Sequence, residues 1–272
     1  MIQQYVIFTD MDGTLLDHNN YDYQDAVPTL TRLKKRGITV IPNTSKTFAE
    51  VMAWRTKLQL TGPFIVENGA AIYIPENFFP TPPQHCELVN GYWVYQFSAN
   101  RSQWIALLKT MHSQFGDLYN SFTEMSLEQI SKLTGLSLHD TELAAQRKYG
   151  EPVHWLGNDS QKEQFIEQLE EQGATILQGG RFIHVSDHCD KGLALQWLFD
   201  EFKRQFPQQS LTSIALGDSH NDIAMLEQAD VAIRIRSDHH LLPKVSANNL
   251  LITSSYAGPK GWAECITEIL NQ

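Results

Sequence analysis

Predicted strands and helices alternate over the first 70 residues, and this alternation restricts the fold more than any other feature. Apolar, β-branched runs at residues 5–9, 38–41 and 64–66 predict three strands. The segments between them, 27–37 and 48–59, have apolar residues at helical spacing, and the first ends in basic residues followed by glycine. Short connections in a strand-helix-strand-helix-strand order predict a parallel sheet covered by helices.

A stretch rich in proline interrupts this alternation. Four prolines lie between residues 75 and 83, which predicts a linker. The residues that follow predict an α+β segment with a strand at 92–97 and a helix at 160–172 that Asp159 or Ser160 caps. The alternating pattern returns after residue 187. We therefore expect an α/β core with a Rossmann-like parallel sheet, residues 1–82 and 187–272, and an inserted α+β domain, residues 83–186.

The charge balance excludes several classes of partner. Lys and Arg number 21 and Asp and Glu number 31, so the formal net charge is −10. Nucleic acid and anionic membranes require a basic face, and we expect neither as a partner. The sequence shows no apolar run of about 20 residues and no signal-peptide pattern at its start. With three scattered cysteines, it predicts a cytoplasmic protein and leaves the oligomeric state open.

Carboxylates cluster directly after two of the predicted strands. Asp10 and Asp12 follow the first strand, and Asp218 and Asp222 follow a later one. Open α/β sheets bind ligands at the carboxyl ends of their strands. Because neighbouring carboxylates repel one another, the pattern favours a bound Mg²⁺, which prefers oxygen ligands. For either cluster alone, a role in capping helices or forming turns stays open.

Four motifs at these strand ends resemble those of the haloacid dehalogenase superfamily of phosphotransferases. The residues that carry the resemblance are Asp10, Asp12 and Thr14; Thr44; Lys191; and Asp218, Asn221 and Asp222. They occur in the order of the family and span nearly the whole chain. The insertion lies between the second and third motifs, which is where this superfamily carries its larger, α/β type of cap. The resemblance therefore implies a haloacid dehalogenase-like core with a cap that selects the substrate.

Further segments are similar to the mannosyl-3-phosphoglycerate phosphatases. These segments are residues 43–47, 67–70, 134–137, 151–155, 179–185 and 258–262. The chain departs from the pattern at Thr44, where serine is common, and at Lys260, where an acid is expected. The similarity implies a small phosphorylated sugar-glycerate substrate and a Mg²⁺-dependent phosphatase.

The resemblance also implies a role for each catalytic residue. Asp10 would attack phosphorus and form an aspartyl phosphate, and Asp12 would transfer protons as general acid and base. Thr44 and Lys191 would bind the phosphoryl group and stabilise its charge. The implied metal ligands are Asp10, Asp12, Asp218 and Asp222, with Asp12 acting through its main-chain carbonyl and Asp222 in a supporting place. The implied substrate contacts are Thr44, Ser45, Asn68, Arg181, Lys191 and Asn221.

Other functions stay open at this stage. A phosphatase of glucosyl-3-phosphoglycerate or of sucrose phosphate would share all of this chemistry, and a phosphomutase would return the phosphoryl group to the sugar. A non-catalytic binding protein would be expected to lack one of the motif acids or Lys191, and none is missing. His239 and His240 have no acidic or cysteine partner at zinc spacing, so we expect them to lie in a solvated loop.

Overall fold

The computed structural model describes residues 3–178, 182–246 and 250–271. The chain forms two compact units. The first unit comprises Met1–Ser45, Trp54–Tyr95 and Asp190–Gln272. The second comprises Lys46–Ala53 and Gln96–Cys189.

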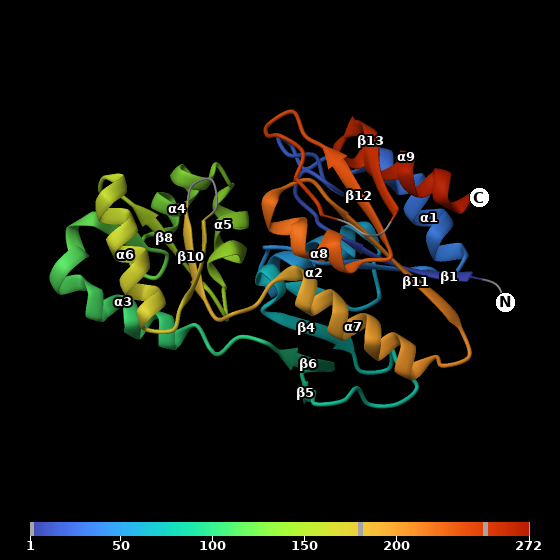
Figure 1. Cartoon of the computed structure of the whole chain (residues 1–272), viewed down its shortest axis with the longest axis horizontal. Helices are drawn as coiled ribbons and strands as arrows, with labels where there is room; N and C mark the ends of the chain where they lie inside the picture. The colour runs from blue at the N-terminus through green and yellow to red at the C-terminus, as the bar shows by residue number, and fades with distance from the viewer. Residues whose placement is uncertain (1–2, 179–181, 247–249, 272) are drawn as a thin grey trace. The chain divides into compact units, whose positions relative to one another are not determined.

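A parallel sheet of five strands forms the centre of the first unit, in the order β13-β12-β11-β1-β2 (Figure 1). Its strands are β1 (Gln3–Thr9), β2 (Thr39–Pro42), β11 (Ser210–Gly217), β12 (Val231–Arg236) and β13 (Leu250–Ala257). Thr9, the last residue of β1, lies opposite both Leu216 and Pro42. The loops after these three strands therefore begin at the same edge of the sheet. The predicted parallel core is confirmed.

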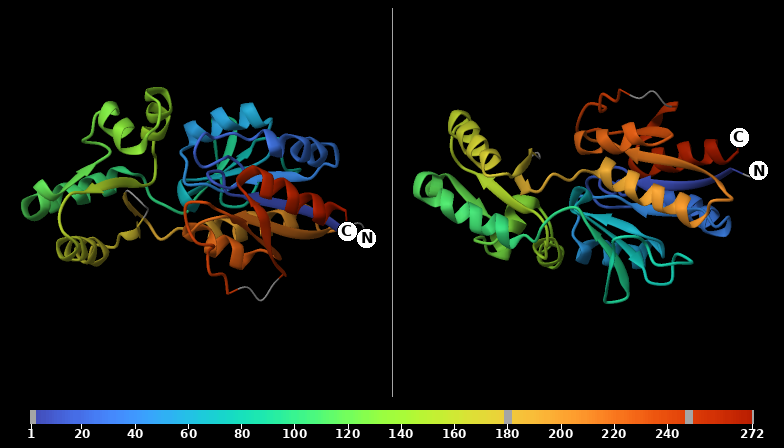
Figure 2. Two further views of the ribbon diagram at one scale, coloured as in Figure 1. Left: turned by 90° about the horizontal axis from the view of Figure 1, so that it is seen from above. Right: turned by 60° about the horizontal axis from the view of Figure 1, so that its bottom comes forward.

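Helices cover both faces of this sheet. They are α1 (Val27–Lys35) after the 3₁₀ turn η1 (Gln24–Ala26), α7 (Lys191–Gln205), α8 (Ile223–Gln228) after the 3₁₀ turn η4 (His220–Asp222), and α9 (Gly258–Leu270). Strands β2 and β12 lie on opposite sides of the β1-β11 pair, so right-handed crossovers place α1 and α8 on opposite faces. Helix α9 packs beside α1, and α7 packs beside α8 (Figures 1 and 2).

A second, antiparallel sheet completes the first unit, and it differs from the sequence prediction. Its order is β3-β4-β6-β5, with β3 (Phe64–Val66), β4 (Ala71–Pro75), β5 (Glu87–Val89) and β6 (Tyr92–Gln96). Strand β3 follows α2 (Phe48–Leu58), and we predicted it as a third strand of the parallel sheet. It pairs antiparallel with β4, because the turn η2 (Glu67–Gly69) reverses the chain. Of the predicted parallel pairing, a single bridge between Asn43, just after β2, and Ile65 is present.

The proline-rich stretch predicted as a linker lies within the first unit and does not separate the two units. Strand β4 ends at Pro75, and the strand predicted for the insertion at 92–97 is β6, whose pairing is within this second sheet of the first unit. The division of the chain into a catalytic core, 1–82 and 187–272, and a cap, 83–186, stays a prediction.

An antiparallel sheet in the order β7-β8-β10-β9 organises the second unit. Its strands are β7 (Tyr119–Ser121), β8 (Glu151–Trp155), β9 (Thr175–Gln178) and β10 (Ile183–Ser186). The helical segments are α3 (Ser102–Phe115), η3 (Gly116–Leu118), α4 (Leu127–Thr134), α5 (Leu138–Ala145) and α6 (Asp159–Glu171). Helices α3 and α6 lie side by side and share one core with the sheet, in which Phe115, Tyr119 and Phe165 are buried (Figure 1).

The start of α6 corrects a detail of the sequence prediction. We expected Asp159 or Ser160 to cap this helix, but the cap is Asn158, whose side chain accepts a 2.9 Å hydrogen bond from the Gln161 N–H. Across the ranges that the structure describes, helices are too short or too polar to cross a membrane.

Candidate active site

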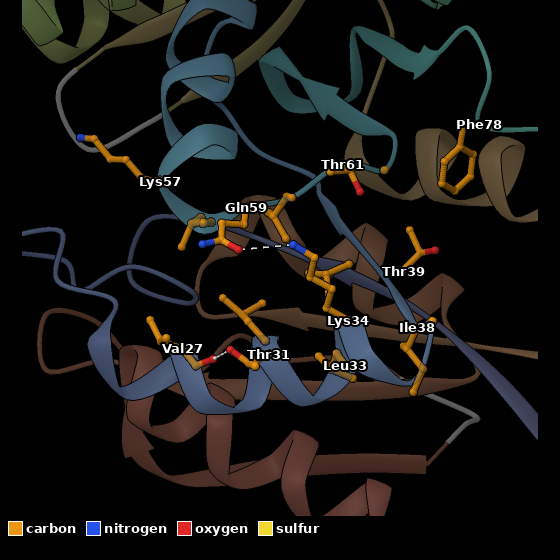
Figure 3. Close-up of a pocket in the computed structure, with 16 residues that line it drawn as sticks. Val27, Thr31, Leu33, Lys34, Ile38, Thr39, Lys57, Gln59, Thr61 and Phe78 are labelled. Atoms are coloured by element: carbon orange, nitrogen blue, oxygen red, sulfur yellow. Dashed lines mark hydrogen bonds between the residues drawn. The ribbon is translucent and has the colours of Figure 1, made fainter.

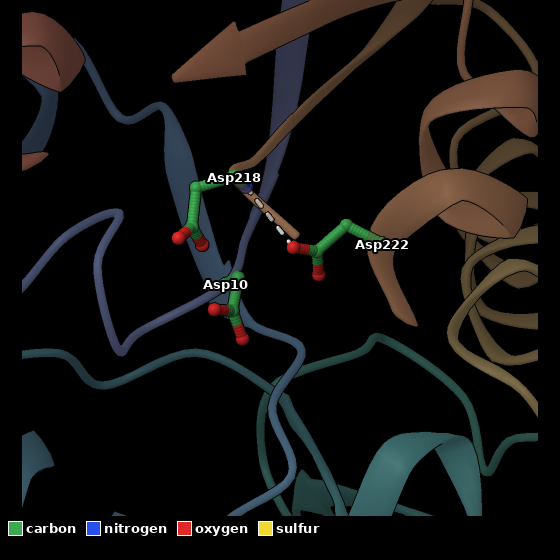
Figure 4. Close-up of side chains that lie close together, drawn as sticks. All are labelled: Asp10, Asp218 and Asp222. Atoms are coloured by element: carbon green, nitrogen blue, oxygen red, sulfur yellow. Dashed lines mark hydrogen bonds between the residues drawn. The ribbon is translucent and has the colours of Figure 1, made fainter. Parts of the chain in front are cut away.

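Three carboxylates from two segments of the chain meet at the carboxyl edge of the parallel sheet (Figure 4). Asp10 follows β1, Asp218 follows β11, and Asp222 ends the turn η4. One oxygen of each lies within 4.8 Å of the others. Their residues are 5%, 1% and 0% exposed, respectively. Three buried acids at this distance repel one another unless cations compensate them.

Lys191 supplies one of these cations. It is the first residue of α7, where a lysine would ordinarily be solvated, yet it is fully buried. Its Nζ lies 2.6 Å from Asp10 Oδ1 and 2.6 Å from Asp222 Oδ1. Asp190 fixes the start of the helix by accepting a 2.7 Å hydrogen bond from the Leu193 N–H. The structure thus brings Asp10, Lys191 and Asp222 together, as the sequence motifs imply.

Two glycines allow this close approach. A side chain at Gly69 would place its Cβ 2.1 Å from the carbonyl oxygen of Asp190, and Gly69 also has a φ of +95°. A Cβ at Gly217 would lie 2.4 Å from Cβ of Asp222. Neither position has space for any other residue, so both glycines are needed to hold the acids and Lys191 in place.

Asp218 and Asp222 differ in what holds them. Asp222 Oδ2 accepts 3.0 Å hydrogen bonds from the N–H groups of Asp218 and Ser219 (Figure 4 shows the first), while its Oδ1 meets Lys191. Asp218 Oδ1 accepts a 3.0 Å hydrogen bond from Thr14 Oγ1. Asp222 therefore has both oxygens engaged by the protein, and its place is that of a support for Lys191 and for the Asp218 loop.

The electrostatics of this group fit a divalent cation. Burial raises the pKa of Asp10 well above its usual range, although Lys191 opposes the shift. Burial, reinforced by Asp222, raises the pKa of Asp218 to about 7. Burial lowers the pKa of Lys191, but Asp10 and Asp222 outweigh it and raise the pKa above its ordinary value. Three carboxylates against one ammonium leave excess negative charge on oxygen donors, and this donor set suits Mg²⁺.

The other polar residues predicted for the site lie around the end of β2. Thr44 is fully buried, and its main chain joins two turns: its N–H donates to the Ile65 carbonyl at 3.2 Å and its carbonyl accepts from the Asn68 N–H at 2.9 Å. Asn221 Nδ2 donates a 3.0 Å hydrogen bond to Asn68 Oδ1. The β2 end, the turn after β3 and the Asp218 loop are thereby tied to one another.

The remaining residues predicted for the site are Asp12, Ser45 and Arg181. The half-buried Asp12 adds to the negative charge around Asp10 and Asp218 and raises the pKa of both, and its role as a ligand through its main-chain carbonyl stays a prediction. Ser45 is also half-buried. Arg181, predicted to anchor the substrate, lies outside the described residues.

Sequence reasoning missed a group of histidines beside the acids. The prediction that His239 and His240 lie in a solvated loop is confirmed, since both are exposed and outside the helices and strands. The fold nevertheless brings His240 Nε2 to 3.0 Å from Asp218 Oδ2, a contact that the sequence did not predict. The rings of His18 and His239 stack with their centroids 4.2 Å apart. No spacing rule finds these contacts, because the three histidines belong to two loops that only the folded sheet brings together.

A pocket in the first unit lies away from the acids (Figure 3). Its volume is about 240 Å³. Residues along α1, the end of α2 and the start of β2 line it, and Lys34 Nζ donates a 3.3 Å hydrogen bond to Gln59 Oε1 there. Since it adjoins the amino end of β2, whereas the acids follow carboxyl ends, we place no catalytic step in it.

Comparisons with known proteins agree with this geometry. A model of the haloacid dehalogenase-like hydrolase family matches residues 7–256. A Persephonella marina protein named glucosyl-3-phosphoglycerate/mannosyl-3-phosphoglycerate phosphatase is 37% identical over 98% of this chain and 97% of its own length. A Methanococcoides burtonii protein of the same name is 32% identical, over 99% and 98%. A Pyrococcus furiosus protein named mannosyl-3-phosphoglycerate phosphatase is 36% identical, over 86% and 92%.

Solved structures share the fold at lower identity. A haloacid dehalogenase-like hydrolase from Bacillus subtilis has a TM-score of 0.65 at 18% identity and covers 97% of this chain and 99% of its own. The sucrose-phosphatase of Synechocystis, solved with sucrose and phosphate, has a TM-score of 0.57 at 15% identity, with 98% of both chains covered. At these identities the likeness concerns the fold alone.

Proposed function

This chain belongs to the haloacid dehalogenase-like hydrolase family and is a phosphatase, and we propose that it hydrolyses mannosyl-3-phosphoglycerate to mannosylglycerate and phosphate. The observation that carries the chemistry is the buried Lys191 between Asp10 and Asp222, beside Asp218. The names of its relatives support the substrate. Two of those names include glucosyl-3-phosphoglycerate, so the glucosyl ester is the second candidate. We also propose a cytoplasmic location, which the scattered free cysteines favour.

Asp10 acts as the nucleophile of the first step. Its carboxylate attacks phosphorus, the bond between phosphorus and the ester oxygen breaks, and an aspartyl phosphate forms. The leaving alkoxide takes a proton from Asp12. In the second step Asp12 takes a proton from a water molecule, which attacks the phosphorus of the aspartyl phosphate and releases phosphate and the Asp10 carboxylate.

Two contacts of Asp10 act on its charge in opposite directions. Burial favours its neutral form, but the ammonium of Lys191 at 2.6 Å favours the carboxylate. The same ammonium is placed to stabilise charge on the phosphoryl oxygens, together with the hydroxyl of Thr44. Asp222 keeps Lys191 aimed at Asp10 and takes no part in bond making.

We propose that a cation would be held by the oxygen atoms around these acids. Asp10 and Asp218 offer carboxylate oxygens, the main-chain carbonyl of Asp12 offers another, and Asp222 supports them. Mg²⁺ bound there would neutralise charge on the phosphoryl group and its leaving oxygen.

Phosphate release from four esters tests the proposal. Mannosyl-3-phosphoglycerate, glucosyl-3-phosphoglycerate, sucrose phosphate and mannose phosphate are compared with Mg²⁺ and with EDTA. We expect the mannosyl compound to be preferred, and the activity to disappear with EDTA and in Asp10→Asn. Release from other esters alone would keep the mechanism and discard the substrate. Isomerised sugar phosphate without free phosphate would point to a phosphomutase.

A further inference from the structure

His240 contacts Asp218, one of the proposed metal ligands, and the proposed mechanism gives His240 no role. Asp218 is 1% exposed, and its Oδ1 is engaged by Thr14. Its Oδ2 lies 3.0 Å from Nε2 of His240, whose side chain is 34% exposed. His240 lies in the loop between β12 and β13, so it reaches from the solvent-facing side onto a buried carboxylate.

We propose that His240 and Asp218 form a site for Zn²⁺, or for a divalent cation of similar ligand preference, which competes with Mg²⁺ and inhibits the enzyme. Imidazole nitrogen is a preferred ligand of Zn²⁺, whereas Mg²⁺ prefers oxygen and binds imidazole weakly. A cation site built only from the carboxylates of the three acids would lack a ligand that favours Zn²⁺ over Mg²⁺. His240 adds such a ligand, the imidazole nitrogen.

The distance between the two side chains is close to that of two ligands that share one cation. Zinc binds imidazole nitrogen and carboxylate oxygen tetrahedrally at about 2.0–2.2 Å, so two such ligands of one ion lie about 3.3–3.6 Å apart. His240 Nε2 and Asp218 Oδ2 are 3.0 Å apart, so a movement of a few tenths of an ångström by the partly exposed His240 would admit the ion. Asp10, whose oxygen lies within 4.8 Å of the Asp218 oxygen, offers a third ligand. Two carboxylates and a neutral imidazole would balance the charge of the ion.

A contact between two histidine rings links the segment that carries His240 to the loop after β1. The ring of His239 stacks on that of His18, which belongs to the loop after β1. This contact joins the loop that carries His240 to the loop that carries Asp10 and Asp12. His239 itself has its ring on His18 and is the natural control for His240, because it is adjacent in the chain and has the same chemistry.

The competition follows from the geometry of Asp218. Mg²⁺ bound to Asp218 Oδ2 would take the place that His240 Nε2 now has, whereas Zn²⁺ would retain His240 as a ligand. The inference depends on the cation site of the proposed function and not on the identity of the sugar. It can therefore fail while the proposed substrate stands.

Metal binding to the full chain tests the proposal without measuring activity. Calorimetric titrations with Zn²⁺ and with Mg²⁺ at pH 7.5 compare the unaltered chain, His240→Gln and His239→Gln. Since loss of a ligand costs at least as much as loss of a supporting contact, His240→Gln should weaken Zn²⁺ binding by about tenfold or more and His239→Gln by less than about threefold. Mg²⁺ binding should not weaken in His240→Gln.

Two outcomes would overturn the proposal. One is unchanged Zn²⁺ affinity in His240→Gln, and the other is equal weakening for Zn²⁺ and Mg²⁺, since that pattern would mean that His240 only positions Asp218. The visible spectrum of bound Co²⁺ gives a second readout, which His240→Gln should change and His239→Gln should not. If the unaltered chain binds neither Mg²⁺ nor Zn²⁺, the cation site of the proposed function itself fails.

Discussion

At the scale of single residues, the site depends on one lysine that compensates two buried acids. Lys191 Nζ lies 2.6 Å from both Asp10 and Asp222, and all three side chains are nearly or fully buried. Breaking a buried ion pair by removing one partner costs more than the pair itself contributes, because the remaining charge keeps its desolvation penalty. Lys191 is therefore as important for the fold of the site as for its chemistry.

Lys191→Met should lower both stability and activity. The substitution keeps an unbranched side chain that is one atom shorter and leaves two carboxylates facing each other without a cation, so we expect a loss of about 3–5 kcal/mol in the free energy of unfolding. Urea unfolding measures this loss, and added Mg²⁺ should recover part of it. Lys203→Met is the matched control, because Lys203 is exposed and its change should stay within about 0.5 kcal/mol. Equal losses in the two variants would contradict the buried-triad argument.

Asp10→Asn should abolish turnover with the fold intact. The amide has the shape of the carboxylate but is a poor nucleophile, so phosphate release should fall by about a thousandfold or more. Circular dichroism checks the fold, and acid trapping of the phosphorylated protein checks the intermediate. Asp25→Asn, on the exposed surface of η1, serves as the comparison and should retain normal turnover. A trapped phosphoprotein in Asp10→Asn would exclude Asp10 as the nucleophile.

The order of motifs in the sequence was sufficient to predict that four residues lie together: Asp10, Lys191, Asp218 and Asp222. Each follows a strand or begins a helix at the same edge, and that edge is set by local patterns. His240 could not be found in the same way. Its contact with Asp218 depends on the path of a loop after β12, which has no periodicity to interpret.

At the scale of elements, the turn after β3 decides what the strand pairs with. The three-residue run Phe64–Val66 is apolar on both faces, so its pattern is compatible with either a parallel or an antiparallel sheet. Glu67, Asn68 and Gly69 all have positive φ, and this sharp turn sends the chain back along β3 as β4. Asn68 followed by Gly69 is a pair that favours such a turn, but the left-handed conformation of Glu67 has no signal in the sequence.

Gly69→Ala should damage the site through the start of α7. The new Cβ would lie 2.1 Å from the Asp190 carbonyl oxygen, which precedes Lys191, so the helix start or the turn must shift. We expect activity to fall by about a hundredfold, since small displacements of catalytic groups have effects of this order. Gly37→Ala is the control: its φ is also positive, at +68°, but no atom lies within 4 Å of its Cβ. It should lose about 1 kcal/mol of stability and keep its activity. Similar activity in both variants would refute the steric argument.

His184, on strand β10, should make the stability of the second unit sensitive to acid. Burial, reinforced by Arg147, lowers the pKa of His184 from 6.5 to about 3. Between these values the unfolded chain binds a proton that the folded chain does not, so stability is complete above pH 6.5 and falls as the pH drops toward 3. The loss is about 2 kcal/mol at pH 5.

His184→Gln removes this group and should flatten the pH dependence. Urea unfolding at pH 7.5 and pH 5 compares it with the unaltered chain and with His139→Gln, which changes an exposed histidine of α5. The control should keep the acid sensitivity. If His184→Gln also keeps it in full, another group must be responsible.

At the scale of the whole molecule, the chain is two compact units rather than one. A single free energy of unfolding is not defined for such a chain unless both units open together. The acids, Lys191 and His240 all belong to the first unit, and the acid-sensitive His184 belongs to the second. A cation bound to the acids therefore stabilises the first unit directly, and it stabilises the second only if opening of the two is coupled.

Amide hydrogen exchange with and without Mg²⁺ distinguishes these cases. A cation at about a hundred times its dissociation constant adds about 2.7 kcal/mol to whatever unfolds with its site, which slows exchange through that opening by about a hundredfold. We expect this slowing in β1, β11 and α7, and no slowing in β8 and β10 of the second unit. Asp218→Asn, which removes a ligand, should lose the effect in the first unit. Equal slowing in both units would mean that they unfold as one, because a local cation can protect distant amides only through a shared opening.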